Sequence, residues 1–153
     1  MIQIEKADLA DKETVLQLVE TLLRELEGES GEFEGINKEK VWREMAQNQE
    51  RFNAFIAKDE KGAPIGILTL VETFAIYAGG NYGVIDEMYV APAYRAQGVG
   101  KLLLAAAREY GKQRSWLRID VTAPPEEEWA RTVKFYEREG FVFTGPKMRC
   151  KLR

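Results

Sequence analysis

Residues 84–104 read VIDEMYVAPAYRAQGVGKLLL, and this stretch decides the fold. Its apolar opening, residues 84–90, predicts a strand that ends at a proline-containing turn, and the apolar run after the turn predicts a helix over residues 98–110. The first turn of a helix has free backbone N–H groups and a positive dipole end, and both attract anions. Because glycines have no side chains, a phosphate group can approach the main chain here. The turn is therefore predicted to bind phosphate.

Known phosphate-binding patterns differ in where they require glycine. A Walker A loop needs a glycine five positions before its Gly-Lys pair and a Ser or Thr after it, but Arg95 and Leu102 stand there. The dinucleotide pattern GxGxxG needs a third glycine, and Leu103 stands in its place. The pattern Arg/Gln-x-x-Gly-x-Gly/Ala fits at every fixed position, through Arg95, Gly98 and Gly100. A nucleotide-triphosphate P-loop is thus rejected.

Strand and helix patterns alternate along the rest of the chain, without a repeat or a linker. Asp8 or Asp11 is a candidate cap for the first helix, and Asn37 for the second. The predicted strands are residues 2–4, 52–58, 65–72, 84–90, 117–122, 141–143 and 147–152. The predicted helices carry Val15 to Leu26, Val41 to Met45, residues 98–110 and residues 126–139. Residues 28–35 are predicted to form a loop, and residues 74–82 to end in a glycine-rich bend.

This order, β-α-α-β-β-β-α-β-α-β-β, predicts a mixed α/β (α+β) fold in one domain spanning residues 1–153. Short connections favour antiparallel pairing of the early strands, and the helical crossover favours a parallel pair of residues 84–90 and 117–122. We expect a mostly antiparallel sheet flanked by helices. Strict alternation along residues 84–90 would place Val84, Asp86, Met88 and Val90 on one face and Ile85, Glu87 and Tyr89 on the other.

The composition excludes several kinds of site. The chain has no histidine and one cysteine, Cys150, which rules out Ser-His-Asp and Cys-His machinery, histidine metal sites, a cysteine zinc cluster and an internal disulfide. We therefore expect no metal. The net charge of -3 argues against nucleic acid or an anionic membrane as a partner. A charged start without a signal-peptide core and the lack of a long apolar run predict a cytoplasmic protein.

Two phrases of the sequence resemble the GNAT superfamily of N-acetyltransferases. In that family the first phrase typically reads E-x-x-V-x-P-x-Y-R-x-x-G-x-G, and the second resembles F-Y-E-x-x-G-F. The first is matched by Glu87, Val90, Pro92, Tyr94, Arg95, Gly98 and Gly100, and the second by Phe135, Tyr136, Glu137, Gly140 and Phe141. The resemblance implies the GNAT fold, with its parallel strands splayed, and acetyl-CoA as co-substrate.

The resemblance also implies how the co-substrate is bound. The backbone N–H groups of the turn would hold the pyrophosphate, with Arg95 opening the motif, and the strand before the turn would pair with the pantetheine arm as a further strand. The residues implicated are Gln97, Gly98, Val99, Gly100 and Lys101 for the pyrophosphate, and Met88, Tyr89 and Val90 for the pantetheine arm. Plain core packing is the alternative role for Met88 and Val90.

Acetyl transfer to an amine needs a base for the amine proton and an acid for the leaving thiolate. Helical spacing puts Trp129, Thr132, Val133 and Tyr136 on one face directed at the sheet, and Tyr136 matches the tyrosine that GNAT enzymes often place near the coenzyme sulfur. Glu87 matches a frequent carboxylate position. We predict Tyr136 as the acid and Glu87 as the base; a core tyrosine and a carboxylate paired with a nearby cation are the alternatives. An acyl intermediate on Cys150 is not expected.

The acetyl acceptor is the feature on which the sequence carries the fewest motifs. The resemblance implies direct attack, in a ternary complex, by a primary amine of a small molecule or peptide, bound by residues 22–42 and 74–82. An acidic run within residues 25–34 suits a cationic amine, although a solvated face or a mobile loop is the favoured explanation. A non-catalytic acyl-CoA-binding regulatory or interaction module on the same fold is the alternative function. A homodimer is compatible with either function.

Overall fold

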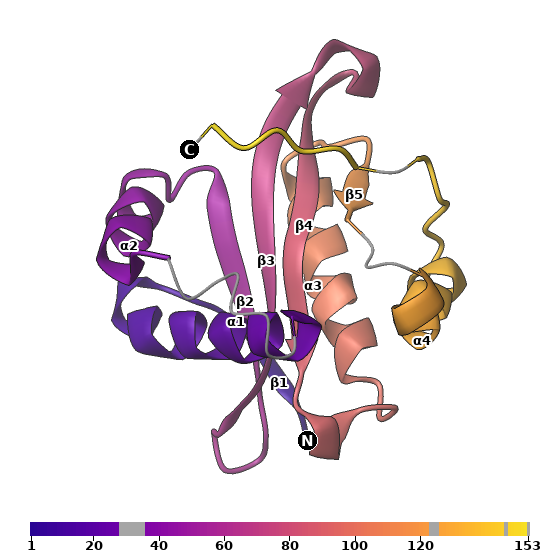
Figure 1. The fold of residues 1–153 in the computed structure, drawn as a ribbon. Helices are drawn as coiled ribbons and strands as arrows, with labels where there is room; N and C mark the ends of the chain where they lie inside the picture. The colour runs from indigo at the N-terminus through magenta and orange to yellow at the C-terminus, as the bar shows by residue number, and fades with distance from the viewer. Residues whose placement is uncertain (28–35, 123–125, 146, 153) are drawn as a thin grey trace.

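The computed structural model describes residues 1–27, 36–122, 126–145 and 147–152, so the predicted loop at 28–35 lies outside the described residues. Its centre is a five-stranded sheet in the order β1-β2-β3-β4-β5 (Figure 1). The first four strands pair antiparallel, and β4 and β5 pair parallel. The predicted sheet and its parallel pair are thus confirmed. The strands are β1 (Gln3–Lys6), β2 (Phe52–Lys58), β3 (Pro64–Ala75), β4 (Gly80–Val90) and β5 (Ile119–Val121).

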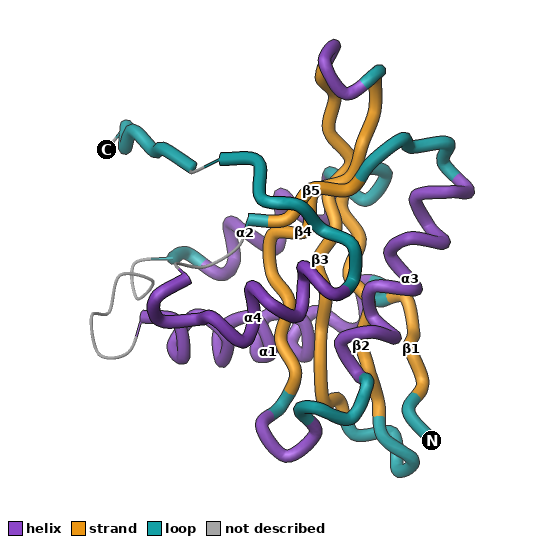
Figure 2. Tube along the Cα trace, turned by 90° about the vertical axis from the view of Figure 1, so that its right-hand side faces the viewer, coloured by secondary structure: helices purple, strands orange, loops and turns teal. Residues whose placement is uncertain are grey.

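Helices cover both faces of the sheet (Figures 1 and 2). Helices α1 (Lys12–Glu27) and α2 (Lys38–Gln47) lie on one face, called here the α1 face, and α3 (Val99–Gln113) lies on the other, the α3 face. Helix α4 (Glu126–Arg138) lies at the β5 side. The predicted caps are present: Asp8 and Asp11 form a capping box ahead of α1, and Asn37 accepts a hydrogen bond from the main chain of α2. Among the described residues, no helix is both long and apolar enough to cross a membrane.

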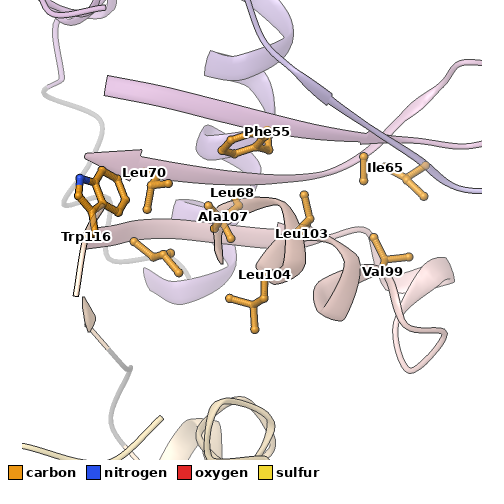
Figure 3. Close-up of a cluster of buried hydrophobic side chains, with 11 residues drawn as sticks. Phe55, Ile65, Leu68, Leu70, Val99, Leu103, Leu104, Ala107 and Trp116 are labelled. Carbon is orange, nitrogen blue, oxygen red and sulfur yellow. The ribbon is translucent and has the colours of Figure 1, made fainter. Parts of the chain in front are cut away.

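The larger core lies on the α3 face (Figure 3). Leu103, Leu104 and Ala107 of α3 are almost wholly buried against β2, β3 and β4. Each leucine contributes roughly 1.5–3 kcal/mol through burial, and this packing holds α3 against the sheet. The buried members are Phe55, Ala57, Ile65, Leu68, Leu70, Ile85, Val99, Leu103, Leu104, Ala107 and Trp116. A smaller core on the α1 face joins Val15, Leu18, Ala54, Ile56, Ile67 and Tyr89.

A β-bulge interrupts β4 and overturns the predicted alternation of faces. Leu68 of β3 pairs with Met88 and Leu70 pairs with Ile85, so one residue of β3 lies opposite two residues of β4. The extra residue reverses the parity of the strand. Ile85 therefore packs on the α3 face together with Met88 and Val90, and not with Tyr89, which packs on the α1 face.

The predicted bend at residues 74–82 is instead the end of a long hairpin. Strand β3 continues to Ala75, a single 3-10 turn follows, and β4 already begins at Gly80. The tip projects beyond the rest of the sheet (Figure 1) and exposes Phe74, Ile76 and Tyr77. Alternation of apolar and polar residues was too weak at these positions to extend the strands.

The two predicted C-terminal strands are wrong for the residues described. Residues 141–145 and 147–152 contain no strand, and Val142, Phe143, Met148 and Leu152 are exposed. A strand needs a hydrogen-bonding edge as well as an apolar pattern, and β5 offers an edge of three residues only.

Candidate active site

The predicted phosphate-binding turn presents a row of free backbone donors. Ala96 has a φ of 60° and Gly98 a φ of 85°, so the main chain turns sharply before α3 begins at Val99. The N–H groups of residues 97–101 donate to no described residue, and the first bond of the helix runs from Leu102 N to Gly98 O at 3.1 Å. Such a run of N–H groups at the positive end of a helix suits an anion. The residues present therefore fit a pyrophosphate.

The two glycines of the turn have different roles. Gly98 is left-handed, and a Cβ there would meet no atom within 4 Å, so the space above it is open to a ligand. At Gly100 a Cβ would lie 3.0 Å from Cζ of Phe135. Gly100 is thus required for the packing of α4 onto the first turn of α3, and the sequence-based explanation, close approach of phosphate, applies to Gly98 alone.

Side chains around the turn stabilise its shape. The Tyr94 hydroxyl donates to Asp59 Oδ2 at 3.1 Å, and Gln97 Nε2 donates to Ala93 O at 2.9 Å. Arg95 lies against β4 and α1: its Nε donates to Val90 O at 2.8 Å, and its Nη2 pairs with Glu25 Oε2 at 2.8 Å. The Arg95 cation is therefore occupied by Glu25 in this structure.

The edge of β4 that faces β5 is open beyond the bulge. Strand β5 pairs with β4 only from Gly83 to Ile85. Further along, Met88, Tyr89 and Val90 pair with β3 on their other side and have no strand partner toward β5 among the described residues. The parallel pair is thus splayed, as an added strand-like ligand requires. Arg95 already uses the Val90 carbonyl at the end of this edge.

Glu87 lies at the bulge and points to the α1 face. Its main-chain N–H donates to Thr69 Oγ1 at 3.0 Å, and the Thr69 hydroxyl donates back to Glu87 Oε1. Burial raises the pKa of the Glu87 carboxyl, the Thr69 hydrogen bond lowers it, and the neighbouring Asp86 raises it, with a net rise from 4.5. A carboxyl with a raised pKa suits proton transfer nearer neutral pH.

Tyr136 lies on the buried face of α4. It is 6% exposed, contacts the rings of Phe135 and Phe141, and shares this face with the buried Val133. Burial raises its pKa to about 12, so the hydroxyl keeps its proton at neutral pH. No described residue accepts a hydrogen bond from it. A buried hydroxyl normally has a partner, and its absence here leaves the donor available to a ligand.

The structure brings the turn and the α4 side of the site together through Phe135, whose ring packs on Gly100 next to Tyr136. Two contacts were not predicted from the sequence, that of Thr69 with Glu87 and that of Glu25 with Arg95. Thr69 was detectable as a polar residue inside the apolar strand ILTLV, whereas Glu25 was assigned to an acidic run that suits a cationic acceptor and pairs instead with Arg95. Cys150 is exposed on the C-terminal segment. Within the described part of the chain, no group of three or more Cys, Asp or Glu side chains is arranged to hold a metal ion.

Residues 50–143 match the family model of the acetyltransferase (GNAT) domain. The chain belongs to the GNAT family of acetyltransferases. An uncharacterised N-acetyltransferase of Bacillus subtilis (strain 168) is 26% identical to this GNAT protein over 89 residues. That match spans 58% of this chain and 58% of the curated relative.

Solved structures share the GNAT fold along nearly the whole chain. An aminoglycoside acetyltransferase from an uncultured soil metagenomic sample superposes with a TM-score of 0.83 at 18% identity, over 100% of this chain and 99% of that one. A predicted acetyltransferase from Clostridium acetobutylicum, solved with acetyl-CoA, superposes with a TM-score of 0.81 at 19% identity, over 99% of this chain and 97% of that one. At these identities the likeness concerns the fold.

Proposed function

We propose that this GNAT protein is an acetyl-CoA-dependent N-acetyltransferase acting on a primary amine of a small molecule or peptide. The observation that carries the proposal is the run of N–H groups at residues 97–101, which donate to none of the described residues, beside the edge of β4 that no described strand covers. The family's use of acetyl-CoA supports the same assignment. The structural relative bound to acetyl-CoA and the aminoglycoside acetyltransferase support a coenzyme site and an amine acceptor in turn.

The binding part of the proposal uses the main chain. Residues 97–101 would hold the pyrophosphate through N–H groups, at the positive end of α3. The exposed Lys101 adds a positive charge at the same helix end. Met88 and Tyr89 would pair with the pantetheine arm along the free edge of β4. Arg95 contributes indirectly, because its side chain holds the turn to β4 and α1.

In the proposed chemistry, one side chain accepts a proton and another donates one. When bound, acetyl-CoA supplies a thioester whose acetyl group passes to an amine nitrogen with release of the thiol. Glu87, as a carboxylate, would accept a proton from the amine, directly or through water. Tyr136, protonated because its pKa is about 12, would donate its hydroxyl proton toward the leaving sulfur. The amine would attack the thioester directly, without an acyl intermediate on Cys150, which is exposed on the C-terminal segment.

Calorimetric titration with acetyl-CoA, with ATP and dephospho-CoA as controls, tests the coenzyme site. We expect binding of acetyl-CoA that is clearly tighter than binding of ATP. A panel of primary amines, assayed for release of free thiol, then tests transfer. Amine-dependent thiol release supports the enzyme; acetyl-CoA binding without release for any amine favours the non-catalytic acyl-CoA-binding module; and no binding contradicts both functions.

A further inference from the structure

The β-bulge creates a gap in the β3–β4 ladder that a side chain fills. Thr69 lies between Leu68 and Leu70 on β3, and it stands opposite both Asp86 and Glu87 of β4. A bulge of this kind leaves a main-chain group without its ladder partner. Here the Glu87 N–H is satisfied by the Thr69 hydroxyl at 3.0 Å.

The same hydroxyl also binds the Glu87 side chain. Its proton is donated to Glu87 Oε1, so Thr69 Oγ1 accepts from the main chain and donates to the carboxylate of one residue. Thr69 is 1% exposed, and the β-branched side chain has few rotamers. The hydroxyl is therefore held in one place, and the carboxylate that it binds is held with it.

We propose that Thr69 is the positioning residue for Glu87, fixing its carboxylate at the bulge and favouring its ionised form. This inference rests on the proposed role of Glu87 as the base. A hydroxyl that donates to a carboxylate stabilises the charged state. Without that donor, a partly buried carboxylate beside another acid would be protonated more readily and would have several orientations.

Among the described residues, the group that stabilises the ionised Glu87 carboxylate is the Thr69 hydroxyl and not a positive charge. On β4 the neighbouring charge is Asp86, which opposes ionisation of Glu87. Lys147 acts on Asp86, and on α1, which packs against β4, Glu25 is paired with Arg95. The hydrogen bond from Thr69 is thus the stabilising contact of the ionised Glu87 among the described residues.

Carboxyl-carbon NMR of the full chain, titrated with pH, tests the contact without needing the acceptor. Thr69→Val should raise the pKa of Glu87 by about one pH unit or more, since a hydrogen bond to a charge is lost, and Thr69→Ser should restore it. Thr73→Val makes the same change four residues along β3 and should leave the pKa unchanged. An unmoved Glu87 titration in Thr69→Val overturns the proposal.

Two further readouts keep the test decisive. If Thr69→Val does not fold, the Thr69 methyl resonance of the wild type should titrate with the same pKa as Glu87; a methyl signal that does not respond overturns the proposal. With an active amine in hand, the acid limb of kcat/KM should move in Thr69→Val by the same shift as the NMR pKa. If the NMR pKa moves but Glu87→Gln retains full activity, the positioning holds and the proposed base is wrong.

Discussion

A buried hydroxyl without a partner among the described residues is the most informative single group in this molecule. The Tyr136 hydroxyl makes no hydrogen bond to a described residue, so its removal leaves no group of the described residues unsatisfied. Tyr136→Phe should therefore keep the free energy of unfolding and acetyl-CoA affinity, while lowering kcat by about 100-fold or more through loss of the acid.

Tyr110→Phe is the matched control for this prediction. The Tyr110 hydroxyl accepts a hydrogen bond from the buried Asn53 at 2.8 Å. This variant should therefore lose about 1 kcal/mol of stability, and its kcat should stay unchanged. Chemical denaturation, calorimetry and a thiol-release assay measure all three quantities. Unchanged kcat in Tyr136→Phe would remove Tyr136 from the mechanism.

Glu87 gives a prediction about pH. Burial raises its pKa above 4.5, so the base form appears only as pH rises through that higher pKa, and kcat/KM should have an acid limb there. Glu87→Gln should remove the limb and lower kcat/KM by about 100-fold. Asp86→Asn should keep the limb but move it to lower pH, because the neighbouring charge that raises the pKa is gone.

The Glu87 carboxyl also affects stability, and its raised pKa determines the direction of that effect. A raised pKa in the folded state means that stability from Glu87 is present below 4.5 and is lost as pH rises through the folded pKa. Glu87→Gln should therefore be at least as stable as the wild type at neutral pH, although it is less active. A large loss of stability would indicate a structural role for the carboxylate.

At the scale of elements, sequence patterns predicted the features that depend on neighbouring residues alone, such as strand bounds and helix caps. Strand β2 was predicted at its observed bounds, and Asn37 as the cap of α2, because apolar runs and caps act within a few residues. The bulge in β4 was not predictable, since it depends on the register against β3. That register decides which face Ile85 and Glu87 occupy. The C-terminal strands failed for the same reason: apolar alternation does not specify a pairing edge.

The turn before α3 gives the prediction at this scale. Gly98→Glu places a negative side chain in the open space above the turn, and its left-handed φ adds backbone strain. We expect acetyl-CoA affinity to fall by about 100-fold or more, as charge repulsion adds to lost N–H contacts. Gly62→Glu, at a φ of 81° with similar open space in the β2–β3 turn, should carry the same strain and bind normally. Normal binding by Gly98→Glu would mean that phosphate binds elsewhere.

At the scale of the whole molecule, the splayed strand pair depends on an anchor remote from the turn. Glu72 of β3 is 9% exposed and accepts two hydrogen bonds from Arg114, at 2.7 Å each, and one from the Trp116 indole. Trp116 packs on Gly83, where a Cβ would lie 2.3 Å from its ring. This cluster joins β3, β4 and the segment between α3 and β5, and it lies at Gly83, where the pairing of β4 with β5 begins.

Removing the charge of Glu72 should therefore lower the free energy of unfolding of the whole domain. Glu72→Gln should lower the free energy of unfolding by about 2–3 kcal/mol at neutral pH, because Arg114 and Trp116 lose a charged acceptor. The Arg114 hydrogen bond holds the pKa of Glu72 below 4.5, so its stabilisation is present above 4.5 and is lost as pH falls through the lowered pKa. Denaturation curves of wild type and variant should converge in acid, whereas the exposed Glu50→Gln should match wild type throughout. A gap that persists in acid would mean that packing, and not the charge, holds this corner together.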